Sequence, residues 1–111
     1  MESNRQKKIA SLIQQEMSML FQKFGLEFLS SIVTVTIVRL SPDLGNAKIY
    51  ISVFPKEKQQ TVYGLIVEKS KVLRFELGKK IRNQIRKIPD LQFYIDDSLD
   101  YAEHINQLLK K

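Results

Sequence analysis

The 111-residue sequence contains no cysteine and no tryptophan, and it has only one histidine, four glycines and three prolines. Without cysteine there is no disulfide scaffold, no cysteine-ligated zinc or iron–sulfur centre and no thiol nucleophile. The sequence has no uninterrupted apolar run near the ~18 residues that a membrane span needs, and its first residues do not resemble a secretory signal. We therefore expect a cytoplasmic protein that needs no cofactor, no metal and no membrane.

The sequence does have an excess of positive charge. Eighteen Lys and Arg stand against twelve Asp and Glu, which gives a formal net charge of +6. Because 43% of the residues are hydrophobic, the chain has enough apolar side chains for one folded domain over residues 1–111. A folded basic protein favours an anionic partner, either nucleic acid or an acidic surface.

The spacing of apolar residues predicts a two-layer α+β sandwich, with a three-stranded sheet and helices on one face. Ala47, Ile49, Ile51 and Val53 alternate with polar or aromatic residues, which is typical of a half-buried strand. A turn over residues 41–46, where Gly or Asn can accept a positive φ, joins this strand to the one before it in an antiparallel hairpin. The expected order is helix 5–24, strand within 28–40, strand 47–54, helix from 59 or 61 to about 88, strand 91–95 and a helix from 97 or 98.

Gly78 interrupts the long helix. The apolar stripe before it includes Val62, Ile66 and Val72, and the stripe after it is rotated by about 120° around the helix axis. One straight helix cannot bury both stripes against the same sheet. We therefore predict a kink at Gly78, since glycine permits a bend at little steric cost.

Positive charge is concentrated between residues 69 and 87, which contain eight Lys and Arg and one Glu, for a net charge of +7. If this segment is helical, its apolar residues lie on one side and its cations on the other. Such an unbalanced face indicates contact with phosphates; the alternative is a merely solvated helix face. Lys7 and Lys8 either extend the cationic surface or only solvate the first helix. The candidate phosphate-binding residues on the helix are Lys79, Lys80, Arg82, Arg86 and Lys87.

Three stretches of the sequence resemble the bacterial ribosome-binding factor A family. They are TVTIVRLSPDLGNAKIYIS at residues 34–52, LRFELGKKIR at 73–82 and IPDLQF at 88–93, followed by Asp97 and Ser98. The resemblance extends over nearly the whole chain, and the three stretches occur in the family's order. Each stretch is modest alone, but together they are fairly specific.

The resemblance implies a KH-like fold of the type II order, α-β-β-α-kink-α-β-α, with a kinked helix pair in place of a Gly-x-x-Gly loop. It also implies a non-enzymatic assembly factor that is a monomer when free. Such a factor binds the small (30S) ribosomal subunit through its 16S rRNA, assists late maturation and rRNA processing, and supports growth in the cold. Arg74 precedes the family's basic helix and is implied in RNA binding, and Arg5 matches an N-terminal arginine. The alternative is a protein-interaction module whose basic face docks an acidic protein.

Other residue groups have simpler explanations. Asp96, Asp97, Asp100 and Glu103 lack the glycine pattern of a calcium loop, so we expect them to complement the dipole of the last helix. His104 has no partner for a proton relay, and no catalytic residue is predicted. Tyr50, Tyr94 and Phe54 are expected on the sheet face without helices, either simply exposed or available for stacking on bases.

Overall fold

The computed structural model describes residues 3–96, and the helices and strands in this range follow the expected order. The predicted last helix, most of the acidic cluster and His104 lie outside the described residues. No helix in residues 3–96 is both long and apolar enough to cross a membrane. The elements are α1 Asn4–Lys23, η1 Gly25–Phe28, β1 Ile32–Leu40, β2 Asn46–Phe54, η2 Lys56–Lys58, α2 Gln59–Glu68, α3 Ser70–Ile81 and β3 Asp90–Ile95.

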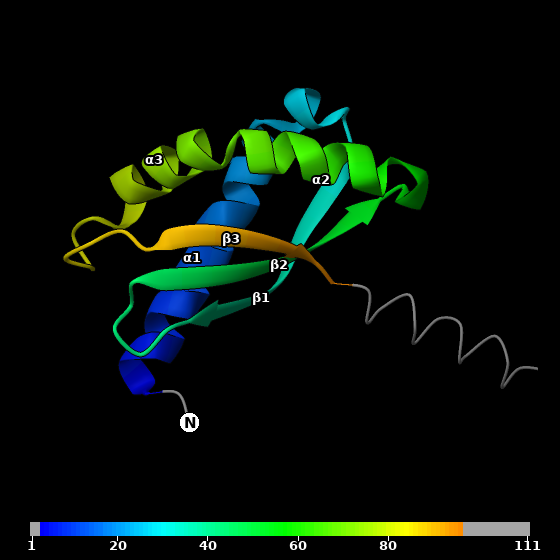
Figure 1. Ribbon diagram of the computed structural model, residues 1–111. Coiled ribbons are helices and arrows are strands. Elements are labelled where there is room, and N and C mark those ends of the chain that lie inside the picture. The colour runs from blue at the N-terminus through cyan, green and yellow to red at the C-terminus, as the bar shows by residue number, and fades with distance from the viewer. Residues whose placement is uncertain (1–2, 97–111) are drawn as a thin grey trace, which may run out of the picture.

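The sheet is mixed and has the strand order β1-β2-β3. β1 and β2 form the predicted antiparallel hairpin, with a register irregularity between Val35 and Ile37. β3 lies parallel to β2 on its other side. α1 crosses behind the strands, whereas α2 and α3 run one after the other along the top (Figure 1).

The core lies between this sheet and the three helices. Ala47, Ile49, Ile51 and Val53 are all buried, as their alternation predicted. Buried side chains of α1, α2 and α3 belong to the same apolar cluster, so the described helices cover one sheet face and leave the other open. This confirms the predicted α+β sandwich.

Two glutamines attach α1 to the edge strand β1. The Gln6 side chain donates a hydrogen bond to the Leu40 carbonyl at 3.1 Å, and the Gln14 side chain donates to the Val35 carbonyl at 3.0 Å. Ser3 and Gln6 also form a capping box at the start of α1. The Gln6 bond holds the first turn of α1 beside the end of β1 and the hairpin turn that follows, and the Gln14 bond holds the middle of α1 beside the middle of β1.

The prediction of a kink at Gly78 was wrong. The helices separate at Lys69, and α3 continues through Gly78 to Ile81. A break at Lys69 also allows both apolar stripes to be buried, because α2 buries Val62 and Ile66 of the first stripe while α3 buries Leu77 and Ile81 of the second. Val72, which we assigned to the buried stripe, is 46% exposed.

Gly78 has a different role, which is to allow close packing. A Cβ atom at this position would lie 3.2 Å from Cγ1 of Ile88, so the absent side chain makes room for the segment that returns after α3. The prediction that the helix continues to about residue 88 was also wrong. Ile85 is buried and Ile88 is partly buried, but an irregular loop over residues 82–89 holds them, and Pro89 disfavours helical backbone at the residue before it.

The two helical glycines provide a test of this packing. We expect Gly64→Ala to raise the free energy of unfolding by about 1 kcal/mol, because alanine favours helix over glycine and no atom lies within 4 Å of the added methyl group. Gly78→Ala should raise the free energy of unfolding by clearly less, since Ile88 must move to accept the methyl group. Chemical denaturation followed by circular dichroism measures both, and equal gains would contradict the packing of Ile88 on Gly78.

Candidate nucleic-acid interface

The loop over residues 82–89 is held by one arginine of α3. Arg74 donates through Nε to the Pro89 carbonyl at 2.9 Å and through Nη2 to the Ile88 carbonyl at 2.7 Å. The same Nη2 lies 3.7 Å from a carboxylate oxygen of Asp90. Arg74 was a candidate RNA-binding residue, but its guanidinium is engaged in holding this loop.

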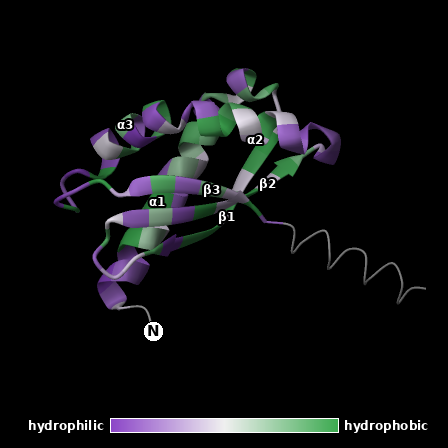
Figure 2. Cartoon of the chain, in the orientation of Figure 1, coloured by the Kyte–Doolittle hydropathy of each residue, from purple (hydrophilic) through white to green (hydrophobic). Residues whose placement is uncertain are grey.

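Between its anchors the loop presents cations to solvent. Ile85 is only 5% exposed, whereas Arg82, Arg86 and Lys87 are exposed. Figure 2 shows that hydrophilic residues gather at the end of α3 and in the loop after it. Buried Ile85 and clamped Ile88 thus give these charges a defined place even though no helix carries them.

The two lysines near the end of α3 differ in their surroundings. Lys79 pairs with Glu76 at 2.8 Å and lies 5.0 Å from the centre of the Phe75 ring. The hydrogen bond from Lys79 is the largest cause of the lowered pKa of Glu76. Lys80 is exposed and has no ion pair within residues 3–96. Lys79 is therefore partly neutralised, and Lys80 is the freer charge.

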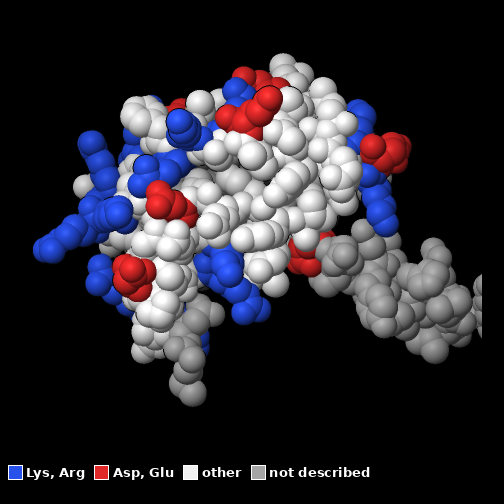
Figure 3. Space-filling view, in the orientation of Figure 1, with Lys and Arg blue, Asp and Glu red and all other residues white. Residues whose placement is uncertain are grey.

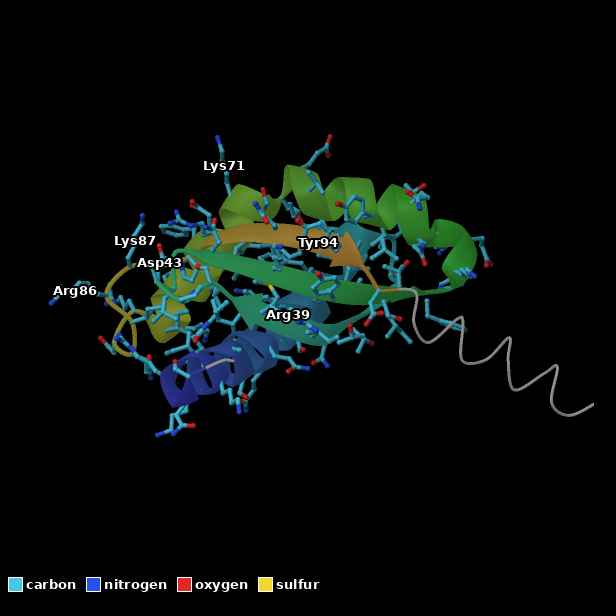
Figure 4. The ribbon with its side chains drawn as sticks, turned by 60° about the horizontal axis from the view of Figure 1, so that its bottom comes forward. Arg39, Asp43, Lys71, Arg86, Lys87 and Tyr94 are labelled. Atoms are coloured by element: carbon cyan, nitrogen blue, oxygen red, sulfur yellow. The ribbon has the colours of Figure 1, made fainter. Side chains whose placement is uncertain are left out.

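The hairpin turn and the start of α1 complete the cationic surface. A hollow of about 460 Å³ is lined by Arg5, by Asp43, Leu44 and Gly45 of the turn, and by Ile85, Arg86 and Lys87 of the loop. Arg5 thus lines the same hollow as Arg86 and Lys87, which are far from it in the sequence. Figure 4 shows Lys87 beside the turn that carries Asp43.

Asp43 stabilises the shape of this turn. Its carboxylate accepts hydrogen bonds from the Ser41 hydroxyl at 2.7 Å and from the Gly45 amide at 3.0 Å. These two bonds are the main causes of its lowered pKa, and the charge of Lys87 contributes further. The positive φ that we expected at glycine or asparagine falls on Leu44, at 60°, because the bonds to Asp43 determine the turn.

We call the surface formed by Arg5, Lys80, Arg82, Arg86 and Lys87 the basic end. Figure 3 shows Lys and Arg gathered at the end of the molecule where α3 ends. Within the described residues, none of these five side chains has a carboxylate partner within ion-pair distance. Several guanidinium and ammonium groups close together suit a polyanion such as the phosphate backbone of RNA.

The lysines of α1 divide between two sides of the helix. Lys8 follows Arg5 by three residues and shares its side, whereas Lys7 lies on the opposite side of the buried stripe. The structure therefore places Lys8 near the basic end and separates Lys7 from it. The pairing of Glu76 with Lys79 could have been predicted from their spacing, whereas no local pattern indicates the clamp by Arg74.

The described residues hold no group of three His, Cys, Asp or Glu side chains arranged for a metal ion. The mixed sheet, the helices on one face and the break between α2 and α3 define a KH-like α+β protein with a basic end. Residues 5–109 match the family model described as Ribosome-binding factor A. The chain belongs to the ribosome-binding factor A family.

Curated relatives agree with this assignment. The chain is 44% identical to ribosome-binding factor A of Cytophaga hutchinsonii, over 100% of this chain and 84% of that protein. It is 43% identical to that of Chlorobaculum tepidum, over 97% of this chain and 90% of the relative.

Two structures from Thermus thermophilus share the fold. The crystal structure of the ribosome-binding factor A from this organism matches with a TM-score of 0.69 at 19% identity, over 81% of this chain and 94% of the other. A homology model of the Thermus thermophilus factor, fitted into a cryo-EM map of its complex with 30S, matches with a TM-score of 0.59 at 20% identity. The match covers 87% of this chain and 97% of the other.

Proposed function

We propose that this chain binds the small (30S) ribosomal subunit by placing its basic end against phosphates of 16S rRNA. It acts there as a non-enzymatic assembly factor that assists late maturation and processing of the 16S rRNA and supports growth in the cold. It works in the cytoplasm and is a monomer when free. Family membership and the 30S complex of the Thermus thermophilus relative support this proposal.

The observation that carries the proposal is the set of cations that have no ion-pair partner within residues 3–96 and whose loop is anchored at both ends. Arg86 and Lys87 stand between a buried isoleucine and the carbonyls that Arg74 holds, and Arg5 joins them from α1. Because the loop backbone that carries Arg86 and Lys87 is held before binding, little loop ordering has to accompany contact with RNA. Cation–phosphate contacts of this kind recognise the shape of folded rRNA more than its sequence.

Sedimentation with purified small subunits at graded salt tests the proposal. If roughly five phosphates are neutralised, the logarithm of the association constant should fall with the logarithm of salt concentration at a slope of about −3.5 to −4.5. Crosslinking from the loop over residues 82–89 should map to 16S rRNA. A slope near zero, or crosslinks only to ribosomal proteins, would contradict phosphate binding by the basic end.

A second candidate function is docking of an acidic protein. Phe75 is 67% exposed and Val72 is 46% exposed on α3, and cations such as Lys71 lie next to them in the sequence. Phe75 also lines a hollow with Arg82 of the basic end, so an acidic partner with apolar side chains can contact α3 and the basic end together. Competition separates the two functions: naked 16S rRNA should displace a partner from the basic end only if this surface binds RNA.

A further inference from the structure

The open face of the sheet carries two tyrosines that lie against each other. Tyr50 on β2 and Tyr94 on β3 are opposite each other in the parallel register. Their ring centres are 5.3 Å apart and the ring planes are inclined by 26°, which is a stacked arrangement. Both side chains point away from the core because Ile49, Ile51 and Phe93 beside them are buried.

Cations flank this pair on one side. Arg39 on β1, Lys48 on β2 and Gln92 on β3 lie opposite one another in the strand register, in the row of the sheet next to the tyrosines. Arg39 and Lys48 are both exposed, and neither has an ion pair or side-chain hydrogen bond within residues 3–96. They line a hollow of about 220 Å³ at the start of the hairpin turn. Figure 3 shows a small group of Lys and Arg over the sheet, apart from the group at the end of α3.

Acidic groups lie at the margins of this surface. Asp96 accepts a hydrogen bond from the Thr36 hydroxyl beyond the tyrosines, on the side away from Arg39 and Lys48. Asp90, at the start of β3, faces Arg74. Arg39 and Lys48 attract a negatively charged backbone to the end of the face near the hairpin turn, where Arg74 partly offsets the charge of Asp90.

The surface is continuous with the basic end through the hairpin turn. Ser41 and Asn46 at the base of the turn border Arg39 and Lys48, and Asp43 to Gly45 at its tip border Arg86 and Lys87. Figure 4 marks Arg39 on β1 and Tyr94 on β3, with Arg86 and Lys87 beyond the turn. A strand bound at the basic end can pass over the turn and reach the tyrosines.

We propose that Tyr50, Tyr94, Arg39 and Lys48 form a second RNA site, which stacks one or two unpaired bases of single-stranded RNA while the cations hold the adjacent phosphates. The site deepens the proposed function and rests on it, since it extends the path of RNA from the basic end. Aromatic side chains on an open sheet face are a general means of binding unstacked bases. A base adds a further ring to the existing stack, and the amide of Gln92, which accepts from the Tyr94 hydroxyl at 3.2 Å, lies within the same surface.

The test uses the full chain and an adenine-rich RNA octamer, with an abasic octamer of the same charge as the matched probe. We expect tighter binding of the base-bearing octamer in fluorescence anisotropy. The chain has no tryptophan, so its emission comes from tyrosine, and the base-bearing octamer alone should quench it. Equal affinity for both octamers, or no quenching, would overturn the inference.

Variants locate the site. Tyr94→Leu should weaken octamer binding by about tenfold, because stacking on one base is worth roughly 1–3 kcal/mol, and it should leave abasic binding unchanged. Tyr94→Phe should keep the affinity, since the ring remains. Phe54→Leu is the matched control, because Phe54 is 67% exposed on the same face but lies opposite Ile32, away from Arg39 and Lys48. Arg39→Ala should reduce the salt slope by about 1.

The outcomes separate this inference from the proposed function. One outcome is that Tyr94→Leu leaves octamer affinity unchanged while replacement of Lys80, Arg82 and Arg86 by Glu still removes small-subunit binding. In that case only the second site is wrong. If the octamer binds at the tyrosines but charge reversal has no effect on subunits, the basic end is wrong, and the extended path with it. If Tyr94→Leu instead leaves octamer affinity unchanged but removes binding of a ribosomal protein, the open face of the sheet binds protein, and the inference of an RNA site there is wrong.

Discussion

Replacing Lys80, Arg82 and Arg86 together by Glu is expected to lower the affinity for small ribosomal subunits by about 100-fold or more at physiological salt. Each phosphate contact releases counterions worth roughly a factor of five under these conditions. Three lost contacts therefore account for about 100-fold, and the introduced carboxylates add repulsion. All three side chains are exposed, so the domain should remain folded, which circular dichroism and thermal unfolding can verify.

A charge-matched comparison makes this prediction specific. The pair Arg82→Glu and Arg86→Glu changes the net charge by the same amount as Lys7→Glu with Lys71→Glu. Lys7 lies on the side of α1 away from Arg5, and Lys71 stands out from α3 (Figure 4). Sedimentation should show a strong loss of small-subunit binding for the first pair of substitutions and little loss for the second pair. Equal losses would mean that net charge alone governs binding, without a localised basic end.

The second large effect is expected from Arg74→Met. This change removes two charge-assisted hydrogen bonds to the Ile88 and Pro89 carbonyls, each worth about 1.5–3 kcal/mol when fully formed. Because the Arg74 side chain is 39% exposed, we expect a loss of about 2 kcal/mol in the free energy of unfolding. Hydrogen exchange should report faster opening of the loop over residues 82–89, and affinity for subunits should fall because the loop loses its fixed shape.

The salt slope distinguishes positioning by Arg74 from direct contact. If Arg74 only holds the loop, Arg74→Met weakens binding while the slope stays the same, because the number of neutralised phosphates is unchanged. Arg74→Lys should recover only part of the affinity, since a single ammonium cannot reproduce the two-pronged geometry. A slope reduced by about 1 in Arg74→Met, restored in Arg74→Lys, would instead place Arg74 on the RNA.

Local patterns predicted much of the fold because they depend on neighbours in the sequence. The alternation in β2 required one face to be buried, and the apolar spacing in residues 5–24 required a helix with one buried stripe. Both expectations were confirmed. The rotation between two apolar stripes correctly indicated a break in the long helix, but not its place. A glycine can mark either a bend or a close contact, and only the neighbour that approaches it distinguishes the two.

The candidate site was also predicted only in part from local patterns. The sequence by itself determined the hairpin, the α+β class and the concentration of positive charge in residues 69–87. Only the tertiary structure decided that Lys69 separates the helices, that Arg74 and Lys79 have partners of their own, and that Arg5 lies beside Arg86 and Lys87. The physical reason is that the spacing of apolar residues acts through neighbours a few positions away, whereas the partner of a charge or a carbonyl depends on which distant segments the fold brings together.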